Sequence, residues 1–180
     1  MIVIDLESTC CDDNKLIPIE DRETIEIGAV VICPCLGEVV DEFVSFVRPV
    51  KNKELTQFCT DFTSITQSDV DSAHTFPEVW INQFIPWLKG VKSFCSWGRY
   101  DLEQFKRDRE RNNLPPYFER HCDASRLAGK NKRLVMKRLG VSLNGRQHRG
   151  LNDAKNVAWI LIKLLEKKTQ IKFKNVVNFP

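Results

Sequence analysis

The sequence of 180 residues predicts an α/β fold with a mixed five-stranded sheet flanked by helices. Three short segments rich in β-branched residues come first, and helical and strand-like segments alternate after them. Short connections among the early segments favour an antiparallel meander, and the later alternation favours parallel strands. Because no internal repeat or Gly/Ser linker interrupts the chain, we expect a single domain over residues 1–180.

The three strands of the meander are predicted at residues 1–6, 24–33 and 39–48. Polar or Gly- and Pro-containing stretches separate them, as is typical of the turns that end strands. After Pro49 we expect an irregular stretch that ends at the next helix.

A helix is predicted over residues 76–88, where apolar side chains recur with helical rather than alternating spacing. Pro77 suits its first turn, and Gly90 follows its end. A fourth strand at 91–97 and a charged helix at 102–111 come next.

A short fifth strand is predicted at 120–124, and a helix at 133–139 stops at Gly140. A loop over 141–150 then leads into the strongest helix. Its apolar positions recur three and four residues apart, at Val157, Ile160, Leu161, Leu164 and Leu165. Similar spacing predicts core positions for three tryptophans, Trp80, Trp87 and Trp159.

The net charge of +3 is unevenly distributed along the chain. Residues 1–98 hold 7 Lys and Arg against 16 Asp and Glu, whereas residues 99–180 hold 20 against 8. Acids that could bind cations therefore lie in the first part, and bases that could meet a polyanion lie in the second. A phosphate-tracking surface would explain the basic part, and a solvated helix face is the alternative.

Cysteine usage and hydropathy predict the compartment. The seven cysteines are an odd number without a C-x-x-C pair, which indicates free thiols in a reducing environment. No apolar run is long enough to cross a bilayer, and no signal-peptide core precedes the first strand. We therefore expect a cytoplasmic protein with no membrane partner.

Two carboxylates share one side of the first predicted strand. Alternate side chains of a strand point to the same face, so Asp5 and Glu7 project together while Ile4 and Leu6 face the core. Their repulsion is unfavourable unless a cation neutralises it, and hard oxygen ligands suit Mg²⁺ or Mn²⁺. A solvated strand end would explain the same pair without a metal.

Two further acids and a histidine follow. Asp101 comes after the fourth predicted strand, close to a helix start, where a helix N-cap is the alternative to a ligand. His148 lies on a glycine-flanked loop five residues before Asp153, in the opening turn of the last helix. A rigid helix start suits a metal ligand and a flexible loop suits a base, whereas a cap and a surface histidine are the alternatives.

The order of these motifs, D-x-E, then D, then H-x-x-x-x-D, resembles the DEDDh exonucleases of the ribonuclease H-like fold over nearly the whole chain. The resemblance is strongest to the enhanced-RNAi (Eri) type of 3′→5′ exoribonuclease. The stretches that show it are residues 4–10, 55–59, 62–67 and 145–156. Ser64 departs from the family, which often has a glycine there.

The resemblance implies a role for each motif residue. Asp5, Glu7 and Asp153 would ligate one metal ion, and Asp5 would bridge to a second. Asp101 would act directly or through water, and His148 would be the general base for the attacking water. The implied cofactors are two Mg²⁺ ions, with Mn²⁺ as a substitute.

The resemblance also suggests residues that bind substrate. It places Phe58 and Tyr100 around the terminal base, where stacking tolerates any sequence. Ser8 and Thr9 follow the catalytic strand and could contact the ribose. A position in the core is the alternative for both aromatic residues.

The expected function is a hydrolase that releases nucleoside 5′-monophosphates from the 3′ end of single-stranded or 3′-overhang RNA. One alternative is a DNA-directed proofreading or repair exonuclease, because only a contact to the 2′-hydroxyl distinguishes the sugars. The alternative from another class is a non-enzymatic scaffold that binds nucleic acid. The natural substrate, the oligomeric state and protein partners are not predicted.

Overall fold

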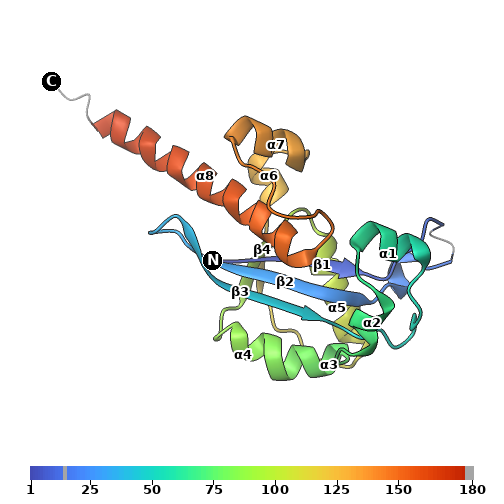
Figure 1. Ribbon diagram of the computed structural model, residues 1–180. Coiled ribbons are helices and arrows are strands. Elements are labelled where there is room, and N and C mark those ends of the chain that lie inside the picture. The colour runs from blue at the N-terminus through green and yellow to red at the C-terminus, as the bar shows by residue number, and fades with distance from the viewer. Residues whose placement is uncertain (14–15, 177–180) are drawn as a thin grey trace.

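A five-stranded sheet forms the centre of the computed structural model, which describes residues 1–13 and 16–176 (Figure 1). Its spatial order is β3-β2-β1-β4-β5. The strands are β1 (Ile2–Ser8), β2 (Thr24–Cys33), β3 (Glu38–Phe46), β4 (Ser93–Ser96) and β5 (Arg120–Asp123). The first three strands pair antiparallel, whereas β4 runs parallel to β1 and β5 runs parallel to β4. The predicted meander followed by parallel strands is confirmed.

Helices cover both faces of this sheet (Figure 1). The long helix α8 (Gly150–Val176) packs on one face. The other face is covered by α3 (Phe76–Val79), η2 (Trp80–Phe84), α4 (Ile85–Trp87) and α5 (Tyr100–Arg111). The shorter elements are η1 (Ile19–Asp21), α1 (Gln57–Thr63), α2 (Gln67–Asp71), α6 (Ala124–Ala128) and α7 (Lys132–Leu139).

Strand β1 is buried on both sides, and its alternation positions the carboxylates. Ile4 and Leu6 pack into the aromatic core beneath α3 to α5, while Val3 packs against α8 on the opposite face. Because side chains alternate along a strand, Asp5 and Glu7 continue the side of Val3. The carboxylates therefore lie under the start of α8, at the end of β1.

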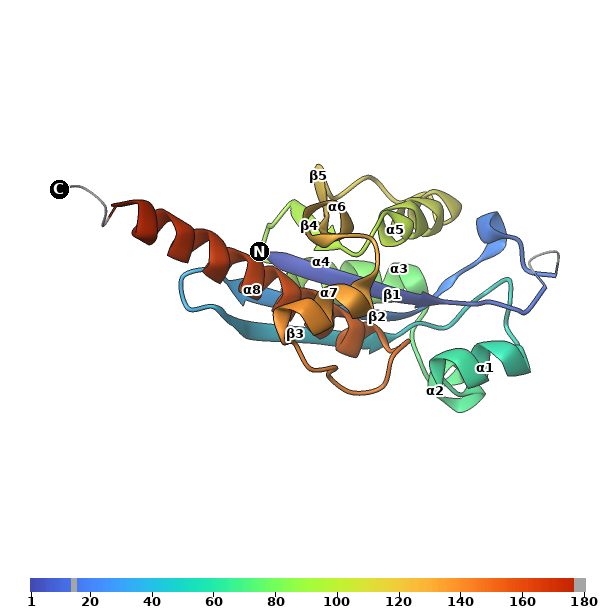
Figure 2. The same cartoon turned by 90° about the horizontal axis from the view of Figure 1, so that it is seen from above.

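The irregular stretch predicted after Pro49 is wrong, because α1 and α2 lie there. In Figure 2 both helices sit beyond the end of the sheet at which β1 terminates. Each begins at a threonine side chain: Thr56 accepts from the backbone N–H of Cys59, and Thr66 accepts from that of Asp69. Helix α1 ends at Ser64, whose φ of 59° is the left-handed conformation that favours glycine.

The helix predicted over residues 76–88 exists, but its middle is widened into the π-helical segment η2. Pro86 has no N–H to donate, and its ring would clash with a carbonyl of the preceding turn in a regular helix. A π turn accommodates such a conflict within a helix.

The three tryptophans that were predicted to lie in the core differ in their burial. Trp80 is buried, as expected, and Trp87 is partly buried against the same aromatic core. The core position predicted for Trp159 is wrong, since it is 36% exposed. It lies on α8 beside the loop at Leu143 rather than toward the sheet.

All seven cysteines are free thiols, which confirms that expectation. Among the residues that the structure describes, no helix combines the length and apolar character that a membrane span needs.

Candidate active site

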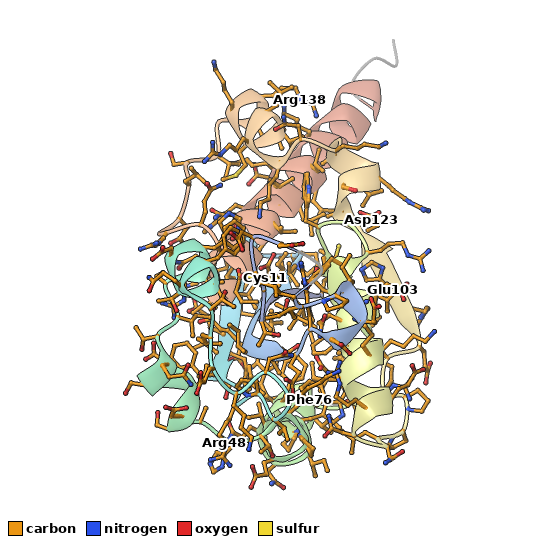
Figure 3. The ribbon with its side chains drawn as sticks, turned by 90° about the vertical axis from the view of Figure 1, so that its right-hand side faces the viewer. Cys11, Arg48, Phe76, Glu103, Asp123 and Arg138 are labelled. Atoms are coloured by element: carbon orange, nitrogen blue, oxygen red, sulfur yellow. The ribbon has the colours of Figure 1, made fainter. Side chains whose placement is uncertain are left out.

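A pocket of about 360 Å³ opens at the end of β1. Figure 3 views the molecule from this side, with Cys11 near the middle and Arg138 of α7 above it. The pocket is lined by Asp5, Leu6, Glu7, Ser8, Cys10, Arg22, Phe62, Trp97, Tyr100, Asp101, Lys132, His148 and Asp153. All five residues of the acidic and histidine motifs are thus brought to one cavity from three separate segments of the chain.

Asp101 is the second residue of α5 and ties that helix to β1. Its carboxylate accepts a hydrogen bond of 2.9 Å from the backbone N–H of Leu6, between the two strand carboxylates. The side chain is 4% exposed. It is therefore bound to a different element rather than capping its own helix.

Asp153 lies in the first turn of α8 and orders the loop before it. Its Oδ2 accepts the backbone N–H of His148 at 2.7 Å. His148 has a φ of 58°, a left-handed conformation that this hydrogen bond helps to hold. Ligand atoms of Glu7, His148 and Asp153 all lie within 4.8 Å of one another.

Two glycines let the start of α8 approach the sheet. A Cβ atom at Gly28 would lie 2.0 Å from the backbone carbon of Gly150, and one at Gly150 would lie 2.8 Å from the backbone oxygen of Asp5. Neither position has room for a side chain. This backbone contact brings Asp153 over the carboxylates of β1.

Glu26 of β2 fixes the same loop from below. Its buried carboxylate accepts the backbone N–H of Gly150 at 2.6 Å and the guanidinium of Arg149 at 2.8 Å. Glu26 is paired with Glu7 in the β1–β2 register, so the residue that anchors the loop lies next to the site. The acid and the loop are 124 residues apart in sequence, and no local motif predicted their contact.

Burial and mutual repulsion disfavour the charged forms of the carboxylates. Burial raises the pKa of Glu7 to about 9, and the charge of Asp153 adds to the rise. Burial raises the pKa of Asp101 to about 6. The pKa of Asp5 is also raised, first by burial and then by the charge of Asp101. This set of hard oxygen donors therefore suits divalent cations, which would neutralise it.

A lysine contacts one of these carboxylates. Lys132, the first residue of α7, places its Nζ 2.6 Å from Oδ1 of Asp153. Burial by itself would lower the pKa of Lys132, but the charges of Asp5 and Asp153 outweigh it and raise that pKa. Sequence reasoning missed this lysine, because nothing distinguishes it from the other bases of its helix.

The surroundings of His148 favour the neutral form of its ring. Burial lowers its pKa below the ordinary value, against the opposing charge of Asp153. Its ring stacks on Phe62 of α1, with the ring centroids 3.8 Å apart. A neutral imidazole on an aromatic support can accept a proton at the mouth of the pocket.

The residues expected to bind substrate lie at different distances from the pocket. Ser8 and Tyr100 line it and share a hydrogen bond of 2.5 Å between their hydroxyl oxygens. Thr9 is buried, and its hydroxyl accepts the backbone N–H of Glu23 instead. Phe58 is outside the pocket lining. It stacks on Phe62, and Phe62 lines the pocket instead.

Two aromatic residues of the lining were not predicted. Phe62 lies four residues after Phe58, the spacing that places two side chains on one helix face, but the helix itself had not been predicted. Trp97 also lines the pocket and donates from Nε1 to the backbone oxygen of Lys130 at 3.2 Å. Nothing in its local sequence indicated that placement.

Comparison with known proteins assigns the chain and its fold to one family. The family model described as exonuclease (RNase_T) matches residues 2–161. The human 3'-5' exoribonuclease 1 is 31% identical, over 94% of this chain and 53% of its own length. The zebrafish (Danio rerio) ERI1 exoribonuclease 2 is 28% identical, over 95% of this chain and 36% of its own.

A solved structure is similar throughout. The nuclease domain of 3'hExo, described as a DEDDh family member bound to rAMP, superposes with a TM-score of 0.85 at 30% identity. The match covers 92% of this chain and 91% of that one. The chain spans about half the length of the human relative and about a third of the zebrafish one.

Proposed function

Because the chain belongs to the exonuclease family (RNase_T), we propose that it is a metal-dependent 3′→5′ exoribonuclease of the DEDDh type. It would hydrolyse RNA from the 3′ end and release nucleoside 5′-monophosphates. The observation that supports this most is the meeting of Asp5, Glu7, Asp101, His148 and Asp153 in one pocket.

The four carboxylates are the residues that would hold the metal ions. Asp5 and Glu7 come from β1, Asp101 from α5 and Asp153 from α8, so the donor set is fixed by three elements. The raised pKa values of Asp5, Glu7 and Asp101 fit a site whose ionised carboxylates are stabilised by added positive charge. Two bound Mg²⁺ or Mn²⁺ ions would supply a nucleophile at neutral pH and stabilise charge on the entering and leaving oxygens.

His148 would act as the general base. It stands on the loop before α8, beside Asp153, and its lowered pKa keeps the ring ready to take a proton. Its ring stacks on Phe62, and one of its nitrogens lies within 4.8 Å of carboxylate oxygens of Glu7 and Asp153. A water molecule bound beside these carboxylates would be within reach of the imidazole.

The pocket walls suit one terminal nucleotide. Tyr100 offers an aromatic face, which stacks with any base and so fits an enzyme without sequence preference. The hydroxyl of Ser8 is hydrogen-bonded to that of Tyr100 in the same pocket that holds the strand carboxylates. A 3′-terminal ribose bound there would meet a hydrogen-bonding group next to its reacting phosphate.

The basic second half of the chain would bind the rest of the substrate. Lys and Arg number 12 against 6 acids between residues 99 and 138. Phosphate contacts of this kind make affinity depend strongly on salt.

The test is degradation of 5′-labelled RNA and DNA oligomers of the same sequence, in Mg²⁺, in Mn²⁺ and in chelator. The proposal predicts stepwise shortening of RNA from its 3′ end, mononucleotide products, and no reaction in chelator. Preferential digestion of DNA would support the repair-type alternative. Binding without any cleavage would support the scaffold.

A histidine variant completes the experiment. His148→Ala should lower the rate at least about 100-fold while RNA and Mn²⁺ still bind. His74→Ala, which changes a histidine whose side chain is 67% exposed, is the matched control and should keep full activity. Wild-type turnover in His148→Ala would exclude it as the base.

A further inference from the structure

Lys132 holds one of the acidic residues of the site in an ion pair. Its Nζ lies 2.6 Å from Oδ1 of Asp153, and the two side chains are 21% and 4% exposed. The other oxygen of Asp153 accepts the backbone N–H of His148. Both oxygens of this carboxylate are therefore occupied by the protein itself.

Contacts before and within α7 determine the position of Lys132. It begins α7, and the chain just before that helix is joined to Trp97, whose Nε1 donates to the backbone oxygen of Lys130. Behind it, Val135 packs with Ile160 of α8 in one buried cluster. These contacts fix the backbone on either side of Lys132.

The charges explain why a cation is needed there. Asp5, Asp101 and Asp153 all act on Lys132, and Glu7 lies in the same lining. Four carboxylates withdrawn from water repel one another, and repulsion over a few ångströms is strong in such surroundings. One ammonium among them offsets part of that cost.

We propose that Lys132 is a tethered counter-ion: it stabilises the metal-free site and must leave Oδ1 of Asp153 when a divalent cation binds there. The inference rests on the proposed function, since it concerns the metal that the same carboxylates would hold. Lys132 and the metal then compete for Asp153, so the lysine weakens metal affinity while it strengthens the empty site.

This competition distinguishes a counter-ion from a structural tie between α7 and α8. If the pair only fastened the helices together, its loss would destabilise the protein and would weaken metal binding or leave it unchanged. Competition predicts opposite effects: a less stable metal-free protein that binds metal more tightly.

The experiment compares Lys132→Met with Lys137→Met in the full chain. Lys137 is exposed on the same helix, so its variant removes the same charge without touching the site. Free Mn²⁺ is measured by electron paramagnetic resonance during titration, and melting temperature is measured in chelator. We expect Lys132→Met to bind Mn²⁺ about tenfold more tightly than Lys137→Met and to melt at a lower temperature without metal.

Equal or weaker Mn²⁺ affinity in Lys132→Met than in Lys137→Met would overturn the proposal. If Lys132→Met does not fold in chelator, Lys132→Gln replaces it, because the amide can still donate to Asp153 without the charge. Tighter Mn²⁺ binding is required of that variant too. If the wild-type protein degrades RNA but the Lys132 variants show unchanged Mn²⁺ affinity, only the counter-ion role of Lys132 is refuted. If the wild-type protein neither binds Mn²⁺ nor degrades RNA, the proposed function is refuted.

Discussion

The imidazole ring of His148 lies over the ring of Phe62, with the centroids 3.8 Å apart and the planes inclined by 27°. Phe62 belongs to α1 and His148 to the loop before α8, so the contact joins two segments that are distant in sequence. Phe58 stacks in turn on Phe62. The proposed base is therefore supported by an aromatic column that stands on one short helix.

The column predicts the effect of removing its middle ring. Phe62→Ala should lower kcat about three- to tenfold, because an aromatic contact of this kind contributes about 0.5 to 1.5 kcal/mol to holding the ring. Phe62→Leu keeps apolar bulk and should lose less. Steady-state kinetics on a short RNA measure both; a raised KM with unchanged kcat would show that Phe62 touches only the substrate.

The anchor beneath the loop gives a second prediction. Glu26→Gln leaves Arg149 without its carboxylate and weakens the hydrogen bond from Gly150, so stability should fall by about 2 kcal/mol and kcat should fall with it. Glu42→Gln, which breaks a partly exposed pair with Lys155, is the control and should cost under about 1 kcal/mol. Thermal melting and turnover are measured together. Equal losses in both variants would contradict a special role for Glu26.

The terminal base should depend on Tyr100. Tyr100→Ala should weaken mononucleotide binding about 5- to 100-fold, since stacking contributes about 1 to 3 kcal/mol per base. Tyr100→Phe keeps the ring and loses only the hydroxyl that meets Ser8, so most of the affinity should remain. Calorimetry with a nucleoside monophosphate and Mg²⁺ measures both. Unchanged binding in Tyr100→Ala would place the base elsewhere.

The metal-free protein should lose stability as pH rises. The folded-state pKa values of Asp101 and Glu7 are raised, to about 6 and about 9, from ordinary values of 3.8 and 4.5. Within those windows the folded chain binds more protons than the unfolded chain, so the free energy of unfolding falls as protons leave. We expect the melting temperature in chelator to fall by roughly 5 to 10 °C between about pH 5 and pH 9.

Excess Mg²⁺ supplies the control for this prediction. A bound cation replaces the protons as the source of positive charge, so most of the pH dependence should disappear when Mg²⁺ is present. Parallel melting curves with Mg²⁺ and with chelator measure this. The same decline under both conditions would assign the pH dependence to groups outside the site.

The sheet and the acidic motifs were predictable because their signals are local. Strand β2 begins and ends where its β-branched run does, and a D-x-E pair on a strand must place both acids on one face. Helices α1 and α2 were missed because seven and five residues are too few to show a helical period. Their threonine caps were the available signal.

The rest of the site depends on contacts between distant segments. Lys132 is one base among several on its helix, and only the packing of α7 on α8 brings it to Asp153. Thr9 follows the catalytic strand directly, yet a change of register after Glu7 accompanies its turn toward Glu23. Neither placement has a counterpart in local spacing.

Gly28 gives the sharpest test of how the site is assembled. A Cβ there would lie 2.0 Å from the backbone of Gly150 and of Leu151, and no backbone atom can yield so far without moving the start of α8. Gly28→Ala should therefore destabilise the protein by about 1 to 3 kcal/mol. It should also lower activity more than the stability loss explains, because Asp153 and His148 belong to the segment at the start of α8 that would be displaced.

Gly90→Ala is the matched control for Gly28→Ala. Gly90 has a φ of +83°, and a Cβ added there would meet nothing within 4 Å, so alanine adds backbone strain without a clash. Melting temperature, turnover and Mn²⁺ affinity are compared at a temperature where both variants are folded. Reduced turnover and weaker Mn²⁺ binding are expected in Gly28→Ala alone. If Gly28→Ala matches Gly90→Ala in both measurements, the contact between Gly28 and Gly150 does not set the distance between β1 and α8.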